Sequence, residues 1–231
     1  MRITYLHQYF NIPAMPGGTR SYKMARRLVA MGHEVNMVTS WREADGRKGW
    51  FVTDEPGIKV HWLPVQYSNR MGFGERIRAF FQFALRSAQR AAALDAEIVF
   101  ATSTPLTIAL PAVYAARRRK VPMVFEVRDL WPEMPIAMGA LKSPLQIRAA
   151  RALETWAYRH AVAVVALSPG MKQGVVDTGY PAGQVAVLPN SSDNQKFAFD
   201  AEAAQRFRDA RPWLGDKPLL IYAGTPGLPE S

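Results

Sequence analysis

The fold of this chain is decided by the stretch MRITYLHQYFNIPAMPGGTRSYKMARRLVAMGHEVNMVTS, residues Met1–Ser40. It opens with an apolar run at residues 3–6, which is too short for a buried helix and is typical of a buried strand. A loop then closes on two glycines, and apolar residues recur at helical spacing until Gly32 ends the helix. A second apolar run at residues 35–39 predicts the next strand. The stretch therefore predicts a β-α-β unit with a glycine pair at the start of its helix.

The start of this helix has the physical character of an anion site. The first turn of a helix carries unpaired N–H groups and the positive end of the helix dipole. Gly17 and Gly18 would let an anionic ligand approach the backbone, and Arg20 could add a charge-assisted contact. Either Thr19 or Ser21 is expected to cap the helix. The same glycine pair is compatible with a plain turn, and the residues alone leave both interpretations open.

Composition narrows the class of protein. The 231 residues suffice for one large or two small domains, and 48% of them are hydrophobic, which is ordinary for a globular core. There is no cysteine, so disulfides and cysteine-based metal sites are excluded. The sequence shows no apolar run long enough to span a membrane and no charged-then-apolar leader, so we expect a cytoplasmic protein. Its net charge of +10 suggests a polyanionic partner, such as nucleic acid, an anionic membrane or a phosphorylated substrate.

Strand and helix patterns continue to alternate as far as about residue 190. This alternation predicts an α/β fold, a Rossmann-like parallel sheet with helices on both faces. The pattern then changes to a charged helix at 201–210 and a short apolar strand at 219–222. We therefore expect an N-terminal domain at residues 1–192. Residues 193–231 are expected to form a linker and the start of a second domain that belongs to a longer protein.

The helix predicted at Gly72–Leu94 has two interpretations. Its apolar side is expected to hold Ile77, Phe80, Phe81, Ala84, Leu85 and Ala88. Phe83 falls outside this side, among the arginines of the same helix. Core packing with a solvated basic face is the simpler interpretation. Alternatively, Phe83 and the arginines contact an anionic membrane, as interfacial helices do.

The next helix is expected to begin after the short buried strand at 97–101. The Thr-Ser-Thr sequence at 102–104 offers hydroxyls to cap it, and Pro105 suits a first turn. Pro111 lies inside the predicted helix and should kink it or divide it into two pieces.

Charged residues follow the buried strand predicted at 121–127. They are Arg128 and Asp129, with Glu133 a turn later. Ligands of α/β proteins bind outside the carboxyl ends of the strands, so this segment is a candidate site.

Several motifs taken together resemble the family 4 glycosyltransferases of the GT-B fold. They are HQYF with PGGTRSYKMARRLVAMGHEVNMVTS, the strand end FEVRDLWPE, the helix start ALSPGMKQGV, and VLPNSSD leading to LIYAGT. Their order across nearly the whole chain carries the resemblance. The sequence is most similar to bacterial members that build O-antigen and other surface polysaccharides, including those that transfer N-acetylated deoxysugars such as fucosamine. The resemblance implies two Rossmann-like domains facing a cleft, and this sequence would hold the N-terminal, acceptor-side domain.

The resemblance also implies roles for individual residues. Gly17 and Gly18, with the adjoining Thr19 and Arg20, would contact the diphosphate of the donor. Further substrate contacts would come from His7, Asn190 and Gly224.

The expected catalytic residues are Arg128, Asp129 and Glu133, and here the sequence departs from the family. The family often has a histidine at the position of Arg128, and an arginine cannot be a general base. Arg128 would instead bind a phosphate or carboxylate of the acceptor, or pair with Asp129 or Glu133. A role in the site and a structural ion network both remain open.

The implied activity is a retaining transfer of a hexosyl or N-acetylaminosugar group from a nucleotide-sugar to a lipid-linked or lipopolysaccharide acceptor. The leaving diphosphate would help deprotonate the acceptor hydroxyl, so the protein mainly positions two substrates. No metal or other cofactor is expected, and the enzyme would lie peripherally on the inner face of the plasma membrane. This chain alone is expected to be inactive, because half of the cleft would be missing.

Two other classes of function are compatible with parts of the sequence. A basic Rossmann-like module that binds nucleic acid is the alternative, but the sequence has no recognised nucleic-acid motif, so no nucleic acid partner is expected. A nicotinamide-dependent dehydrogenase is disfavoured, because Gly-x-Gly-x-x-Gly is absent from the first turn.

Overall fold

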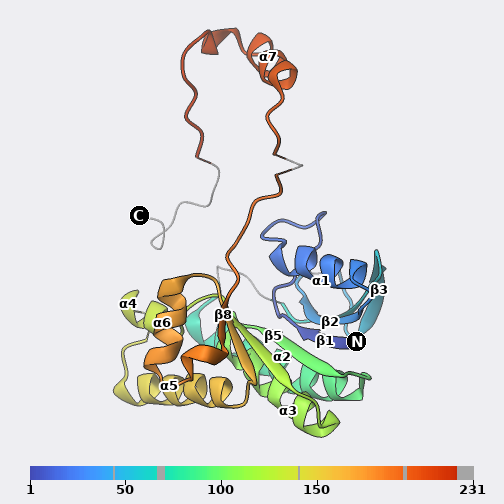
Figure 1. The fold of residues 1–231 in the computed structure, drawn as a ribbon, viewed down its shortest axis with the longest axis vertical. Helices are drawn as coiled ribbons and strands as arrows, with labels where there is room; N and C mark the ends of the chain where they lie inside the picture. Colours follow the sequence, from blue (N-terminus) through green and yellow to red (C-terminus); the bar gives the residue numbers. More distant parts are fainter. Residues whose placement is uncertain (44, 67–70, 140, 195–196, 223–231) are drawn as a thin grey trace. The chain divides into compact units, whose positions relative to one another are not determined.

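The computed structural model describes residues 1–43, 45–66, 71–139, 141–194 and 197–222 (Figure 1). The chain divides into two compact units, Met1–Pro189 and Asn190–Ser231. The larger unit contains the whole sheet. In the smaller unit the described elements are helix α7 (Ala201–Asp209) and a 3-10 helix, η3 (Pro212–Leu214). The boundary predicted after residue 192 falls close to this division.

The larger unit is built on one eight-stranded sheet, in the order β3-β4-β2-β1-β5-β6-β7-β8. The strands are β1 (Arg2–Leu6), β2 (Glu34–Trp41), β3 (Phe51–Glu55), β4 (Ile58–Pro64), β5 (Ile98–Thr102), β6 (Met123–Val127), β7 (Ala163–Ala166) and β8 (Val185–Val187). All neighbours are parallel except β3 and β4, which form an antiparallel pair at one edge. The predicted parallel sheet is therefore confirmed, with one reversed strand added to it.

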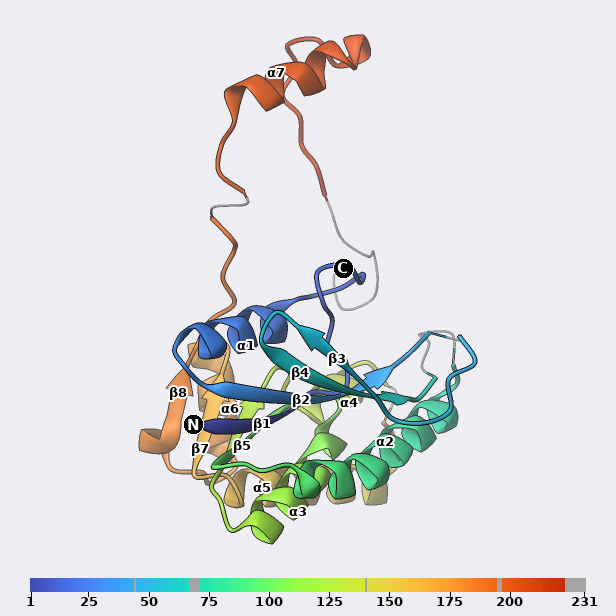
Figure 2. The same ribbon diagram turned by 90° about the vertical axis from the view of Figure 1, so that its right-hand side faces the viewer.

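Helices cover both faces of this sheet, as predicted. They are α1 (Arg20–Ala30), α2 (Phe73–Ala93), α3 (Ala109–Arg119), α4 (Glu133–Ala137), α5 (Pro144–Arg159) and α6 (Pro169–Asp177), with 3-10 turns η1 (Leu106–Ile108) and η2 (Ala182–Gln184). Figure 2 shows α1 on one side of the sheet and α2, α3 and α5 on the other. Alternate residues of each strand point to opposite faces, so the sheet separates two apolar cores.

The packing of α2 corrects the sequence prediction. Phe83, expected on the exposed basic face, is fully buried, whereas Phe81 and Leu85 are 44% and 71% exposed. The buried line of α2 runs through Ala79, Phe83 and Ala91, and α2 packs closely on α3. The small residues Ala79 and Ala91 let α2 pack closely, and the Phe83 ring is buried in the apolar core that α2 shares with α3. Side-chain size therefore decides the buried face here, which a count of apolar residues does not detect.

Two other predicted features differ in the structure. The hydroxyls of residues 102–104 cap no helix; they bond to other strands and loops, as described below. Pro111 does mark two pieces, as predicted, because η1 ends directly before α3 and the proline lies in the first turn of α3.

Residues 219–222, predicted as a strand, are irregular. Within the described part of the chain they form no strand of the sheet.

Helix α5 carries a buried carboxylic acid, Glu154, whose hydrogen-bond partner is the Tyr158 hydroxyl at 2.9 Å from Oε1. Burial raises the pKa of Glu154 to about 7, against the opposing effect of the Tyr158 hydrogen bond. The folded chain then holds a proton that the unfolded chain releases near pH 4.5. Stability should therefore fall as pH rises from about 4.5 to about 7 and level off above that.

We expect Glu154→Gln to flatten this pH dependence and to raise the free energy of unfolding at pH 8 by on the order of 1–3 kcal/mol. Urea denaturation at pH 5 and pH 8 measures the effect. Gln184→Glu, which adds an exposed carboxylate in η2, is the control and should leave the dependence unchanged. An identical pH dependence in Glu154→Gln and the unaltered chain would contradict the assignment.

Candidate functional site

The carboxyl edge of the sheet gathers polar residues from four neighbouring strands. His7 directly follows β1, Arg42 follows β2, Ser103 follows β5 and Arg128 follows β6. These strands are parallel and lie in the order β2-β1-β5-β6, so the four residues line one edge. Helix α1 begins at the same edge because it follows β1.

The two glycines before α1 have different physical roles. Gly17 has a φ of +116°, and a Cβ there would lie 2.6 Å from Asn11 Nδ2, so the turn itself requires glycine. A Cβ at Gly18 would meet nothing within 4 Å. Gly17 is thus explained by the turn alone, whereas Gly18 leaves its backbone open to a ligand.

The first turn of α1 lacks the side-chain cap that the sequence predicted. Thr19 is the N-cap residue, but its side chain makes no capping hydrogen bond, and Ser21 lies inside the helix. An uncapped first turn keeps its N–H groups available to an anion.

Asn11 connects this turn to the end of β2, a role that no sequence pattern predicted. Its Nδ2 donates to the carbonyl oxygen of Gly18 at 3.3 Å, and its Oδ1 accepts a hydrogen bond from Arg42. The guanidinium of Arg42 also lies over the ring of Tyr9, 5.7 Å from its centroid. Burial lowers the pKa of Arg42. The loop after β1 thus holds a half-buried cation beside the glycine turn.

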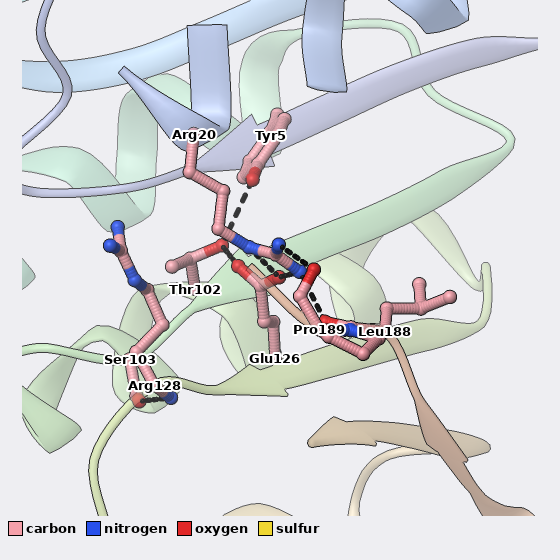
Figure 3. A network of polar contacts seen from close by, with 8 residues as sticks. All are labelled: Tyr5, Arg20, Thr102, Ser103, Glu126, Arg128, Leu188 and Pro189. Atoms are coloured by element: carbon pink, nitrogen blue, oxygen red, sulfur yellow. Dashed lines mark hydrogen bonds and ion pairs between the residues drawn. The ribbon is translucent and has the colours of Figure 1, made fainter. Parts of the chain in front are cut away.

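Arg20 does not stand free for a ligand as the sequence suggested (Figure 3). Its Nε and Nη2 donate to Glu126 Oε1 at 3.1 and 2.9 Å, and Nη1 and Nη2 donate to the carbonyl oxygens of Pro189 and Leu188, each at 2.8 Å. Four of the five guanidinium N–H donors are therefore engaged within the larger unit. Arg20 positions the start of α1 against β6 and the end of β8.

Glu126 is the centre of this network and was not predicted. Its side chain is fully buried, and Oε2 accepts a hydrogen bond from Thr102 Oγ1 at 2.9 Å. Thr102 Oγ1 also lies 3.1 Å from the hydroxyl of Tyr5 on β1. A carboxylate inside the apolar strand sequence MVFEV was the available signal, because such a charge is buried only with a partner.

The three expected catalytic residues follow β6 but do not form one cluster. Asp129 Oδ2 accepts from Thr104 Oγ1 at 2.8 Å, and exposed Glu133 pairs with Arg151 of α5 at 3.2 Å. The Arg128 backbone N–H donates to Ser103 Oγ, while its guanidinium points away from Glu126 (Figure 3). Among the described residues no hydrogen bond or ion pair joins any two of Arg128, Asp129 and Glu133. The predicted ion network between them is therefore absent there.

His7 lies at the end of β1 and is almost completely buried. Burial, together with the positive charges of Arg128 and Arg42, lowers its pKa to about 3. The imidazole is therefore neutral at physiological pH and cannot serve as a cation. Its Nδ1 makes no hydrogen bond within the described residues.

The remaining predicted contacts are less informative. Asn190 begins the smaller unit and is exposed, and Gly224 lies outside the described residues. In the part of the chain that the structure describes, no three His, Asp or Glu side chains are grouped to hold a metal ion. The same part contains no helix both long and apolar enough to cross a membrane.

Several solved structures share this fold. Sucrose-phosphate synthase from Thermosynechococcus elongatus aligns over 90% of this chain and 52% of its own, with 14% identity and a TM-score of 0.64. The trehalose-6-phosphate synthase OtsA aligns over 90% and 55%, with 11% identity and a TM-score of 0.60. HepE from Anabaena, solved with UDP and glucose, aligns over 93% and 55%, with 17% identity and a TM-score of 0.52. The chain thus spans about half the length of these structures.

The family assignment depends on the sequence rather than on these distant structures, which establish the fold alone. No curated protein matches the chain. Residues 17–191 match the glycosyl transferase 4-like domain, and this range covers most of the larger unit, from the glycine turn to the residues after β8. The chain therefore belongs to the glycosyl transferase 4-like family.

Proposed function

We propose that this chain is the acceptor-side half of a retaining glycosyltransferase. The whole enzyme would transfer a hexosyl or N-acetylaminosugar group from a nucleotide-sugar to a lipid-linked or lipopolysaccharide acceptor in surface-polysaccharide synthesis. The observation that carries the proposal is the open backbone at Gly18, beside the uncapped first turn of α1 and on the carboxyl edge of the sheet. Ligands of open α/β sheets bind at this edge.

The chemistry assigned to this half is positioning and charge stabilisation. N–H groups near Gly18 and Thr19 would contact the donor diphosphate as its bond to the sugar breaks. The diphosphate oxygen takes the proton of the acceptor hydroxyl as the new glycosidic bond forms on the same face. Arg128 and Asp129 would orient the acceptor. Arg20 would act indirectly, because it holds the start of α1 in place. Glu133 would lie at the exposed border of the proposed site. This chain alone is expected to be inactive, since the donor-side half is needed to complete the cleft.

Gly18→Ala in the whole enzyme tests the donor contact. We expect the free energy of unfolding to change by less than about 0.5 kcal/mol, because the added methyl group meets no protein atom. Turnover of the nucleotide-sugar should fall about tenfold to a hundredfold, because the methyl group occupies the space of the diphosphate. Steady-state kinetics and urea denaturation measure the two effects.

Gly183→Ala is the matched control, since a Cβ there also meets nothing and the residue lies before β8, at the amino edge of the sheet. It should alter neither quantity. Equal activity of Gly18→Ala and the unaltered enzyme would remove the basis of the proposal. Tight, salt-dependent binding of random DNA without binding of nucleotide-sugars would favour the nucleic-acid module instead.

We also propose that α2 contacts the membrane that carries the acceptor, through a face different from the one predicted. One face of α2 carries four exposed residues, Arg78, Phe81, Leu85 and Arg86. An exposed stripe of apolar and cationic residues suits an anionic lipid surface. This contact would make the protein a peripheral one on the inner face of the plasma membrane.

Phe81→Ser with Leu85→Ser should weaken binding to phosphatidylglycerol-containing vesicles about tenfold or more. The double variant removes the two apolar side chains that would insert into the bilayer. Vesicle sedimentation measures the binding. Met31→Ser, at an equally exposed position after α1 on the other side of the sheet, is the control and should have no effect. Equal binding by the double variant would exclude this face.

A further inference from the structure

A second group of cations lies at the carboxyl edge, apart from the N–H groups of α1. Arg42 and Arg128 are the first residues after β2 and β6, and His7 follows β1 between them. Both guanidinium groups are close enough to His7 for their charges to act on it. The three residues therefore share one region of the edge.

Among the described residues no carboxylate pairs with either arginine. Arg42 is half-buried, and its described partners are the neutral amide of Asn11 and the ring of Tyr9. The Arg128 guanidinium makes no hydrogen bond or ion pair with the described residues, and Figure 3 shows it turned away from the buried carboxylate of Glu126. Partly buried cations without a carboxylate are costly unless an anion joins them.

The residue that follows β1, between the two arginines, is itself enclosed by protein. His7 is 3% exposed, and its Nδ1 has no hydrogen-bond partner among the described residues. Gln8 next to it is fully buried, and both its amide oxygen and its amide nitrogen also lack a partner there. Buried polar atoms are nearly always satisfied, so these enclosed atoms of His7 and Gln8 are expected to bind ordered water, and the two arginines alone carry the argument for a ligand.

We propose that Arg42 and Arg128, with the neutral imidazole of His7, form a subsite for a phosphate, phosphodiester or carboxylate carried by the acceptor substrate. The inference rests on the proposed function, and it deepens that function by naming the class of acceptor as anionic near the hydroxyl that receives the sugar. The two arginines bind the negative charge. The imidazole of His7 adds no charge of its own, so the arginines set the charge of the subsite.

Calorimetry on the whole enzyme tests this with three probes: N-acetylglucosamine 1-phosphate, neutral N-acetylglucosamine, and UDP for the donor side. The sugar phosphate should bind at least tenfold more tightly than the neutral sugar. Arg128→Gln and Arg42→Gln should each weaken the sugar phosphate about tenfold or more, because each removes a charge-assisted contact. Both variants should leave UDP within about twofold of the unaltered enzyme.

Arg148→Gln, at an exposed arginine of α5, is the matched control and should change none of the three affinities. The Arg128 guanidinium pairs with none of the described residues, so its variant stays informative if Arg42→Gln disturbs the loop. An NMR titration of His7 adds a readout that a purely structural role would not move. Its pKa should rise when the sugar phosphate binds, because the bound anion offsets the two positive charges.

The outcomes separate this inference from the function on which it rests. If both arginine variants weaken UDP as much as the sugar phosphate, the arginines serve the donor, and the acceptor subsite is overturned while glycosyl transfer stands. Equal affinities for the neutral and the phosphorylated sugar would also overturn it. If the sugar phosphate depends on the arginines but UDP does not bind, the proposed function fails and the anion subsite remains.

Discussion

Replacing Glu126 by alanine is expected to lower the free energy of unfolding of the larger unit by about 3–5 kcal/mol. The substitution leaves the Arg20 guanidinium next to β6 without its counter-charge, and that side chain is only 17% exposed. It also removes the acceptor for Thr102 Oγ1 and for two N–H groups of Arg20. Urea denaturation followed by tryptophan fluorescence measures the loss.

The chain offers a matched control in Glu133, whose ion pair with Arg151 is about half exposed on both sides. Glu133→Ala should cost less than about 1 kcal/mol, because solvent screens an exposed pair. The double variant Arg20→Met with Glu126→Leu should recover most of the loss, since no buried charge is left unpaired. Equal losses for Glu126→Ala and Glu133→Ala would show that burial adds nothing to this pair.

Phe83→Ala should be comparably severe, at about 3–5 kcal/mol, because it removes a fully buried ring from the apolar core that α2 shares with α3. A cavity in a closely packed core cannot collapse without moving the elements around it. Thermal unfolding followed by circular dichroism gives the change in stability.

Phe81 is the control for this prediction, since it is the same residue type in the same helix but 44% exposed. Phe81→Ala should cost about 1 kcal/mol or less. If Phe81→Ala were as damaging as Phe83→Ala, the assignment of the buried face of α2 would be wrong.

The sheet was predictable from the sequence because its strands are buried apolar runs separated by amphipathic helices. Strand β6, MVFEV, and strand β7, AVVA, carry that signal in a few residues. The face of α2 was not predictable from apolar spacing, because Ala79 and Ala91 matter as places where another helix fits closely. Such a choice depends on the partner helix, and the sequence of α2 alone does not contain it.

The candidate site, like the fold, was predictable only in part. Its location followed from Gly17, Gly18 and Arg128, since loops after parallel strands meet at one edge. The partners within it did not follow, because Arg20 meets Glu126 across a separation that no local pattern reports. The Thr-Ser-Thr sequence at 102–104 resembles a helix cap locally, yet two of its hydroxyls, on Thr102 and Thr104, bond to carboxylates at the end of β6.

The side chain of Asn11 has a consequence for how this edge tolerates chemical change. As an amide it both accepts a hydrogen bond from Arg42 and donates one to the carbonyl oxygen of Gly18. Hydrolysis of this amide to aspartate would replace one NH₂ group by an oxygen, with almost no change in shape. The resulting carboxylate would neutralise the positive charge of Arg42 and repel the Gly18 carbonyl oxygen. One chemical change at Asn11 would therefore remove the cation and destabilise the glycine turn together.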